Sequence, residues 1–302
     1  MSSEKVWVNG EYIDKANAIV NINLGALHYG TAVFEGISCV GKKGKNAIFR
    51  LREHLVRLLE SAGLLGLKVH YSIEQLSGAI IGLVKMNNYN SCYIRPVIFS
   101  NADYLHLTPD DNRITVAILC EPFYFYQFLL HMRRKIKVGI SYAAVVQHDE
   151  RLLKAKLSGR YLQNALAFAE ARKSRFDDAV LLNTAREVTE TTAANIFVIQ
   201  NGAIKLPMRR NTINGIVQDS IIRIAEDIGY CVTEEKISLN ALHNADEIFL
   251  TSTAKGIVTV GQVGPKKIED VSDFSIADKL RKIYVDIITG RSSRYNHWLT
   301  YI

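Results

Sequence analysis

Residues 49–62 read FRLREHLVRLLESA, a stretch in which apolar side chains recur every three or four positions. This spacing predicts an amphipathic helix. A second helix should follow, because Ser72 and Gln75 have the spacing of a capping box, and it should end at Asn87-Asn88. Strand-like sequence comes before and after this pair of helices rather than between them. The order of elements therefore predicts an α+β domain.

Several strands are predicted around the two helices. Residues 6–13, VWVNGEYI, alternate apolar and polar residues around Asn9-Gly10, a strong signal for a β-hairpin. Further strands are expected at residues 31–40, 92–100 and 113–121. Pro96 has no backbone N–H, so it places the strand at 92–100 at a sheet edge or a bulge. We expect this domain to end near residue 125.

The rest of the chain is predicted to be rich in strands. The run GIVQDSIIRIAEDIG, residues 215–229, has one apolar face and ends in a capping glycine, which predicts a helix. Expected strands cover 136–145, 179–182, 195–199, 231–237, 247–253 and 257–260, and further helices cover 159–173 and 275–289. The predicted division is a small N-terminal α+β domain at 1–125, a connection at 126–134 and a larger, strand-rich C-terminal domain at 135–302.

Composition limits the classes of protein to consider. The chain has 302 residues, of which 48% are hydrophobic and 22% charged. Such a chain can bury a sizeable core, and its length favours two domains over one. The net charge is +7, from 37 basic and 30 acidic residues, but the basic residues are scattered without interleaved aromatic residues. We therefore expect small-molecule substrates, anionic ones included, and no nucleic acid.

The cysteines and the apolar segments bear on where the protein works. The four cysteines lie far apart without metal-ligand spacing, so we expect no disulfide framework, no metal site and a cytoplasmic location. The N-terminal sequence MSSEKVWVNGEYI lacks the apolar region of a signal peptide. The most apolar stretch, residues 114–130, is interrupted by Glu121, Pro122 and Gln127, which argues against a membrane span.

Common catalytic signatures are missing from the sequence. It contains no G-x-x-x-x-G-K-[ST], G-x-G-x-x-G, H-E-x-x-H or G-x-S-x-G motif. Two turns rich in glycine or hydroxyl groups remain, Asn214-Gly215 before a helix and TSTA, residues 251–254, after a strand. A helix N-terminus can hold a phosphate, although most helices begin in this way without binding anything.

Six blocks of sequence occur in the order and at nearly the spacing of a known family: LHYGTAVFEGI (27–37), FRLREHLVRLLESA (49–62), YIRPVIF (93–99), KLSGRYLQN (156–164), EVTETTAANIF (187–197) and LTSTA (250–254). They resemble motifs of the branched-chain amino acid aminotransferases, which are class-IV, fold-type-IV pyridoxal-phosphate enzymes. The resemblance implies a two-domain α+β fold of the D-amino acid aminotransferase type, with pyridoxal 5'-phosphate (PLP) at the domain interface. It also implies a homodimer or a higher homo-oligomer.

The resemblance assigns catalytic roles to individual residues. Lys156 should bond to the cofactor and then move the α-proton of the substrate, with Lys154, two positions earlier, as the rival. Burial and neighbouring positive charge should lower the pKa of the Lys156 amine. Glu190 should face the pyridine nitrogen and keep it protonated, and Tyr161 should hydrogen-bond the 3′-oxygen of the cofactor. Without the resemblance, Glu190 could equally be an exposed loop residue.

The phosphate of the cofactor has its own implied ligands. Arg57 matches the family's phosphate-binding arginine, although a simple helical ion pair with Glu53 is the alternative. The backbone of Ile216 and Val217 and the hydroxyl of Thr253 should complete the binding site. All of these groups suit a dianionic phosphate.

The implied substrates are an L-branched-chain amino acid (leucine, isoleucine or valine) and 2-oxoglutarate, as in branched-chain amino acid biosynthesis. An apolar pocket selects branched side chains by burial. Arg95 with Tyr93 should bind the distal carboxylate of 2-oxoglutarate, although either could be an ordinary strand residue. The residues implied in substrate binding are Tyr29, Phe34, Tyr93, Arg95, Phe123, Tyr126, Thr253 and Ala254.

Four positions depart from the family pattern, several of them at the expected rim of the substrate pocket. Ser38 stands where many members have arginine, and Ala194, Val217 and Lys255 replace residues that are commonly polar, hydroxylated and small, respectively. The alternatives on the same fold are a D-amino acid aminotransferase, an aminodeoxychorismate lyase and a specialised biosynthetic transaminase. The alternative from another class is a non-catalytic basic binding protein.

Overall fold

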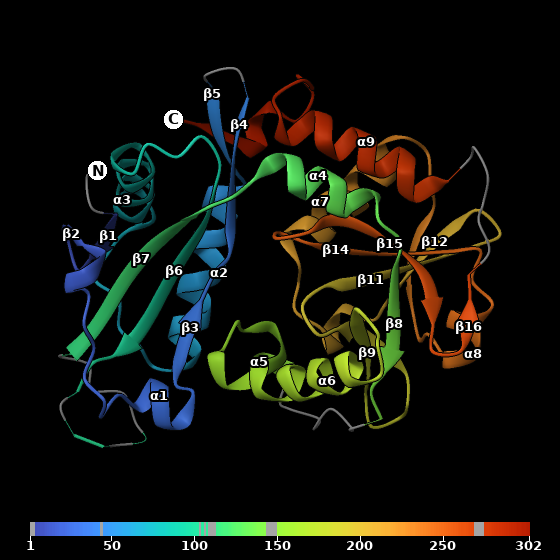
Figure 1. The fold of residues 1–302 in the computed structure, drawn as a ribbon, viewed down its shortest axis with the longest axis horizontal. Coiled ribbons are helices and arrows are strands. Elements are labelled where there is room, and N and C mark those ends of the chain that lie inside the picture. The colour runs from blue at the N-terminus through green and yellow to red at the C-terminus, as the bar shows by residue number, and fades with distance from the viewer. Residues whose placement is uncertain are drawn as a thin grey trace. The chain divides into compact units, whose positions relative to one another are not determined.

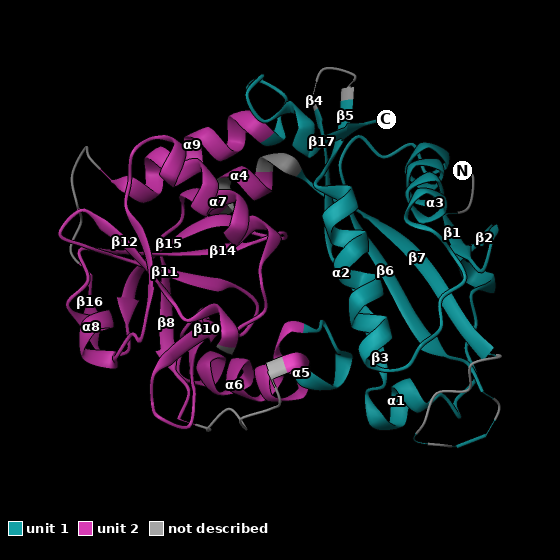
Figure 2. Ribbon diagram, turned by 180° about the vertical axis from the view of Figure 1, so that it is seen from behind, with its two compact units in different colours: residues 1–125, 155–161, 288–302 teal, residues 126–154, 162–287 magenta. Residues whose placement is uncertain are grey.

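A computed structural model describes residues 4–42, 45–102, 104–105, 107, 113–142, 150–268 and 275–302. The chain forms two compact units, drawn in teal and magenta in Figure 2. Unit 1 comprises residues 1–125, 155–161 and 288–302, and unit 2 comprises residues 126–154 and 162–287. The chain therefore returns to unit 1 for a short segment that contains Lys156. The domain boundaries expected from the sequence remain a prediction.

Unit 1 is built on an antiparallel sheet that has eight strands in the part of the chain the structure describes. The strand order is β17-β5-β4-β6-β7-β1-β2, and β3 also pairs with β6. The strands are β1 (Lys5–Val8), β2 (Glu11–Asp14), β3 (Ala32–Phe34), β4 (Ile37–Lys42), β5 (Lys45–Phe49), β6 (Cys92–Ser100), β7 (Ile114–Pro122) and β17 (Leu299–Tyr301). The hairpin predicted at Asn9-Gly10 is confirmed, because β1 and β2 pair across these two residues.

Two helices of unit 1, α2 (Leu51–Leu64) and α3 (Ile73–Met86), pack on each other and on the sheet (Figure 1). Their apolar faces are buried, as the periodicity predicts. The predicted capping box is confirmed: Gln75 N donates to Ser72 Oγ, and Ser72 N donates to Gln75 Oε1. A short helix, α1 (Gly25–Tyr29), precedes β3 and was not expected from the sequence.

The prediction of a single strand at residues 31–40 is wrong, because this segment forms two strands, β3 and β4. Both strands pair with β6, Phe34 opposite Val97 and Ile37 opposite Ile94. Between them, the Glu35 N–H donates to the Pro96 carbonyl at 2.9 Å. Pro96 has no N–H that could donate to the Glu35 carbonyl in exchange. The ladder of backbone hydrogen bonds is therefore interrupted at this position. β6 is an inner strand, so Pro96 marks an irregularity and not a sheet edge.

Unit 2 contains a mixed sheet, with nine strands among the described residues, in the order β10-β9-β8-β15-β14-β11-β12-β13, with β16 paired to β15. The strands are β8 (Ile136–Ile140), β9 (Asp178–Leu182), β10 (Val188–Thr191), β11 (Asn195–Gln200), β12 (Ala203–Pro207), β13 (Val232–Glu235), β14 (Glu247–Ser252), β15 (Gly256–Val263) and β16 (Lys266–Lys267). The strand predicted at 136–145 ends early, and residues 143–149 lie outside the described part of the chain.

The helices of unit 2 are α4 (Phe125–Arg133), α5 (Glu150–Lys154), α6 (Tyr161–Lys173), α7 (Ile216–Asp227), α8 (Leu239–His243) and α9 (Ile276–Ile288). The first residue of α4, the first residue of α6 and the last residue of α9 belong to unit 1. The helices predicted at 215–229 and 275–289 are confirmed as α7 and α9. Gly229 and Gly290 follow them with φ of +89° and +67°, which is the left-handed conformation expected of a capping glycine.

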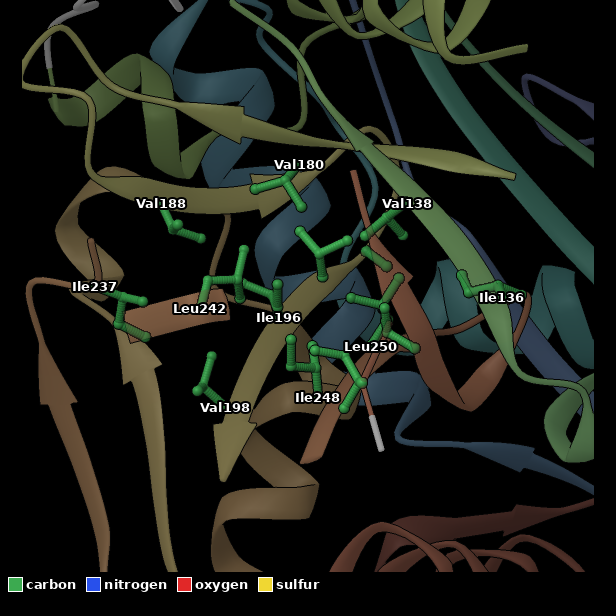
Figure 3. Packing of buried hydrophobic residues seen from close by; sticks show 14 of the residues in the cluster. Ile136, Val138, Val180, Val188, Ile196, Val198, Ile237, Leu242, Ile248 and Leu250 are labelled. Carbon is green, nitrogen blue, oxygen red and sulfur yellow. The ribbon is translucent and has the colours of Figure 1, made fainter. Parts of the chain in front are cut away.

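Strand side chains form the core of unit 2 (Figure 3). Ile196 and Val198 of β11 and Ile248 and Leu250 of β14 are buried in one cluster. Alternate residues along a strand point to the same face, which is why these side chains meet. Within the described residues, no helix is both long enough and apolar enough to cross a membrane.

Candidate active site

Lys156 lies in a short segment of unit 1 that is held from two sides. Its carbonyl accepts a hydrogen bond from Phe34 N at 3.2 Å, and its N–H donates to Ser61 Oγ of α2 at 3.1 Å. The next residue, Leu157, forms an antiparallel bridge with Val33 of β3. These backbone contacts fix the position from which the Lys156 side chain starts.

Two glycines allow the turn after Lys156 to approach the end of α1. Gly159 N donates to Gly30 O at 3.0 Å, and Gly30 has a φ of +69°. A Cβ atom on Gly30 would stand 2.5 Å from the Cα of Gly159, which is too close for any side chain. Gly30 is therefore needed both for its backbone conformation and for the space that it leaves.

The Lys156 amine contacts the hydroxyl of Tyr161, with 2.6 Å between Nζ and Oη. The same amine lies 5.1 Å from the ring centre of Phe34 and 5.1 Å from that of Tyr161. Burial, with a further contribution from the positive charges of Arg57 and Arg95, lowers the pKa of Lys156 to about 8, although Glu35 acts in the opposite direction. A substantial fraction of the amine is therefore neutral, and nucleophilic, at a slightly alkaline pH. The shift and both of its causes agree with the sequence-based expectation.

Lys154, the rival lysine, has a different environment. It is the last residue of α5 and its side chain is exposed. Lys154 belongs to unit 2, whereas Lys156 lies beyond the end of α5, in the segment of unit 1. Lys156, in contrast, is half-buried and contacts the hydroxyl of Tyr161.

Arg57, on α2, is bound by a glutamate that the sequence analysis did not select. Glu35 accepts from Arg57 Nε at 2.5 Å and from Nη2 at 2.8 Å. His54, one turn earlier on α2, places Nδ1 2.8 Å from Glu35 Oε2. The carboxyl of Glu35 and the ring of His54 are fully buried. One feature of the sequence could have indicated Glu35: it is the single acidic residue in the apolar run AVFEGI. A buried acidic residue is rare unless it is paired, so such a position predicts a partner.

Phe34, Tyr93 and Arg95 form a second group beside Lys156. The guanidinium of Arg95 lies 4.4 Å from the ring centre of Phe34 and 5.3 Å from that of Tyr93, and Nη2 donates to the Tyr93 hydroxyl at 3.0 Å. Arg95 Nε is buried and has no hydrogen-bond partner. A Cβ atom on Gly36 would lie 1.9 Å from the Tyr93 hydroxyl, so only glycine leaves room for this phenol.

The other residues expected to bind substrate in unit 1 are less closely grouped. Tyr29, at the end of α1, is 48% exposed. Phe123 follows β7 and is half-buried. Tyr126 is part of α4, but its side chain lies outside what the structure describes. Ser38, the departure from arginine, is buried in β4 directly opposite Tyr93.

In unit 2, Glu190 lies in β10 and is 7% exposed, so it is not an exposed loop residue. A buried carboxylate, Asp178, holds the turn that follows β10: its oxygens accept from Thr192 Oγ1 at 2.6 Å, Thr192 N at 3.2 Å and Thr191 Oγ1 at 3.3 Å. Lys255 Nζ lies 3.6 Å from Asp178 Oδ2. The Lys255 departure therefore forms an ion pair inside unit 2.

The remaining expected cofactor residues lie at two turns of unit 2. Thr253 and Ala254 are in the turn between β14 and β15, where Lys255 N donates to Ser252 Oγ at 3.2 Å. Ile216 and Val217 are buried in the first turn of α7, whose N-cap residue is Gly215. A Cβ atom on Gly215 would lie 2.0 Å from Asn195 Oδ1, so a side chain here would displace Asn195, whose Nδ2 donates to the Ile213 carbonyl at 3.0 Å. Ala194, the third departure, is buried in the turn before β11.

The groups of unit 1 suit PLP. A partly neutral amine can attack an aldehyde, a tyrosine hydroxyl can donate to a ring oxygen, and a guanidinium can bind a phosphate. Among the described residues, no three His, Cys, Asp or Glu side chains gather in a way that could hold a metal ion.

The model of the family described as amino-transferase class IV matches residues 32–263. The chain belongs to this class-IV aminotransferase family. It is 30% identical to the branched-chain-amino-acid aminotransferase of Pseudomonas aeruginosa over 297 residues, which cover 98% of this chain and 97% of that protein. The predicted family and enzyme class are confirmed.

Solved structures give the same result for the fold. The T.th. branched-chain amino acid aminotransferase, in complex with N-(5'-phosphopyridoxyl)-L-glutamate, is similar with a TM-score of 0.92 and 33% identity. The same protein in complex with 4-methylvaleric acid is similar to the same degree. Each comparison covers 100% of this chain and 99% of the other. The predicted α+β fold of this aminotransferase class is confirmed.

Proposed function

We propose that this protein transfers the amino group between an L-branched-chain amino acid and 2-oxoglutarate, reversibly, with PLP as cofactor. The observation that carries the proposal is the Lys156 amine, which contacts Tyr161 at 2.6 Å and has a pKa lowered to about 8. The similarity to branched-chain aminotransferases supports the substrate class. The 4-methylvaleric acid bound in one relative has the carbon skeleton of leucine without its amino group.

PLP, when bound, supplies an aldehyde and an aromatic ring that accepts electrons from the substrate. The neutral Nζ of Lys156 would hold the cofactor through its aldehyde carbon and would serve as the base that moves the α-proton of the substrate. Tyr161 Oη, already in contact with that amine, donates to the 3′-oxygen and orients the ring. Arg57 binds the phosphate, and we assign the same role to Thr253 and the first turn of α7. Glu190 holds a proton on the pyridine nitrogen.

The residues around Lys156 explain how two kinds of side chain are accepted. Phe34 and Tyr93 offer aromatic surface that suits a branched aliphatic side chain, whose burial contributes about 0.8 kcal/mol per methylene. Arg95 rests on this aromatic surface and has one buried N–H without a partner. An acidic substrate would give that group the acceptor that it lacks. We assign Tyr29, Phe123, Tyr126 and Ala254 to the same substrate site.

Replacing Arg95 by alanine is expected to weaken the half-reaction with 2-oxoglutarate by about 1.5–3 kcal/mol, the usual range for a hydrogen bond to a charged group. The half-reaction with leucine should change much less, because its side chain offers no acceptor. Lysine at this position should recover only part of the loss, since it lacks the planar fork of arginine. Single-turnover rates of both half-reactions on one preparation separate the effects. Equal losses in both would show that Arg95 binds the α-carboxylate or supports the fold.

The overall reaction is tested by isotope transfer. Purified protein with PLP, ¹⁵N-labelled leucine and 2-oxoglutarate should form ¹⁵N-glutamate and 4-methyl-2-oxopentanoate in equal amounts, as detected by mass spectrometry. Equal amounts are required because each amino group leaves one acid and enters the other. The absence of labelled glutamate, with PLP bound, would overturn the proposed substrates.

We propose further that the protein is a homodimer or a higher homo-oligomer that works in the cytoplasm. Large apolar side chains are exposed: in unit 1 Ile19 is 84% and Ile22 74% exposed, and on α6 Leu162 is 69% and Leu166 58% exposed. Leu162 and Leu166 are four residues apart and share one helix face. The four cysteines are free thiols even though Cys39, Cys92 and Cys120 are buried as neighbours in the sheet of unit 1, which supports a reducing compartment.

The double variant Leu162→Glu with Leu166→Glu is expected to weaken self-association by at least about 100-fold, because burying each leucine contributes about 1.5–3 kcal/mol. Sedimentation velocity of the wild type should give a mass of at least twice 33.9 kDa, and the variant should dissociate. Leu64→Glu, at an exposed leucine at the end of α2, is the control and should leave the mass unchanged. A monomeric wild type would contradict the assignment.

A further inference from the structure

Glu35 is placed between β3 and β4, at the break in the sheet of unit 1, with no exposed side-chain surface. Burial by itself would raise the pKa of this carboxyl, but the charge of Arg57 and the hydrogen bond from His54 hold it well below its usual range. Glu35 is therefore ionised, and a buried carboxylate without partners would cost several kcal/mol. Its two side-chain partners both come from α2, the helix that also supports the Lys156 segment through Ser61, and the Gly36 N–H donates to Oε2 at 3.2 Å.

The geometry of the Glu35–Arg57 pair fixes one edge of the guanidinium. A guanidinium has five N–H donors in one plane. Glu35 Oε1 accepts from Nε and Oε2 accepts from Nη2, so the pair is bidentate and cannot rotate about a single hydrogen bond. The pKa of Arg57 is raised because Glu35 outweighs the effect of burial, so its positive charge is retained. The edge formed by Nη1 and Nη2 is the second edge by which a guanidinium can bind an anion such as a phosphate.

His54 is the second side chain that holds the Glu35 carboxylate. Burial lowers the pKa of His54 despite the opposing effect of Glu35, so the ring is neutral. An ionised carboxylate can only accept, so His54 carries its proton on Nδ1 and donates it to Glu35 Oε2 at 2.8 Å. His54 Nε2 is buried and has no hydrogen-bond partner. His54 thus contacts Glu35 through one ring nitrogen, and this hydrogen bond helps to position the Glu35 carboxylate.

We propose that Glu35 is a positioning residue for cofactor binding: supported by His54, it holds Arg57 in the single orientation in which the guanidinium receives the phosphate of PLP. This inference rests on the proposed function, because it takes the phosphate as the anion that Arg57 binds. Glu35 contacts Arg57, His54 and the Gly36 N–H, and in this proposal it acts on the phosphate only through Arg57. Its negative charge also balances Arg57 beside the Lys156 amine, so that two positive groups can share one buried region.

The test compares PLP with pyridoxal, which has the same ring and aldehyde but no phosphate. Dissociation constants of both are measured by absorbance on the full-length apo-protein for the wild type and for Glu35→Gln. Without the Glu35 carboxylate, the Arg57 side chain can adopt other rotamers. We therefore expect the preference for PLP over pyridoxal to fall at least about tenfold. Pyridoxal affinity should change less than about threefold, because it depends on Lys156 and Tyr161. Glu53→Gln, on the same helix and paired with Arg50, is the matched control.

A second pair of variants covers the case in which Glu35→Gln fails to fold. His54→Asn keeps a donor near the position of Nδ1 and should retain the preference for PLP, whereas His54→Phe keeps the ring but removes the donor and should lose part of it. An unchanged or larger preference in Glu35→Gln, or equal behaviour of the two His54 variants, overturns the inference. A wild type that binds PLP no better than pyridoxal overturns the proposed cofactor role of Arg57 itself, whatever the Glu35 variant does.

Discussion

Replacing Lys156 by alanine is expected to abolish amino transfer. The variant loses the amine that attacks the aldehyde and the base that moves the α-proton, and loss of a general base alone costs a factor of about 10² to 10⁴. Multiple-turnover activity should fall below detection, while the fold is kept because the backbone contacts of the segment do not involve the amine. Lys154→Ala is the matched control. It removes an exposed lysine two positions away and should retain activity.

The site of attachment can be mapped directly. Borohydride reduction of the protein with PLP, followed by peptide mapping, should place the pyridoxyl group on Lys156. Trapping of free pyridoxal at Lys156 should rise as the pH passes through about 8, because only the neutral amine attacks and burial lowers its pKa to that value. A surface lysine would respond near pH 10.4. A label on Lys154, or on neither lysine, would refute the assignment.

The Glu190→Gln variant is expected to bind the cofactor but to transfer the α-proton at least about 10²-fold more slowly. Removal of a single group that stabilises charge in an active site typically slows the reaction by this factor. A neutral amide cannot stabilise a protonated pyridine nitrogen, so the ring becomes a poor acceptor of electrons. The measurement is the single-turnover rate with ordinary and α-deuterated leucine. A larger isotope effect in the variant should accompany the slower rate.

The control for this variant is Glu187→Gln, three residues earlier. Glu187 forms an ion pair with Lys236 at 3.2 Å and a hydrogen bond with Asn183, outside the proposed site. Its replacement should leave the rate within about threefold, as expected of a partly exposed surface pair. Near-normal turnover in Glu190→Gln would mean that another residue faces the pyridine nitrogen.

Local signals in the sequence were sufficient for the helices and tight turns. Apolar periodicity located α2 and α7, and the Ser72–Gln75 capping box, which has the predicted hydrogen bonds, located α3. The break between β3 and β4 could not be predicted from residues 31–40 alone. It depends on Pro96, more than 50 residues away in the sequence, which faces Glu35 only after β6 has paired. Non-local pairing therefore limited the prediction of strands.

The candidate site shows the same limit. The resemblance selected Lys156 and Tyr161 together, and the structure brings these two side chains into contact. It did not indicate Glu35 or His54, because their role depends on a buried network that no short motif describes. A helical pairing rule suggested Glu53 as the partner of Arg57, but the carboxylate that binds Arg57 comes from a position 22 residues earlier, between two strands. Tertiary burial, and not local spacing, selects that partner.

The most direct test of the proposed function is a set of half-reactions on purified protein with PLP bound. Each amino acid is added without an acceptor, and the change in cofactor absorption is followed by stopped flow. We predict rapid and complete conversion by L-leucine, L-isoleucine, L-valine and L-glutamate, and none by D-alanine or D-glutamate. Conversion by the D-amino acids alone, or no conversion by any branched-chain amino acid, would contradict the proposed function.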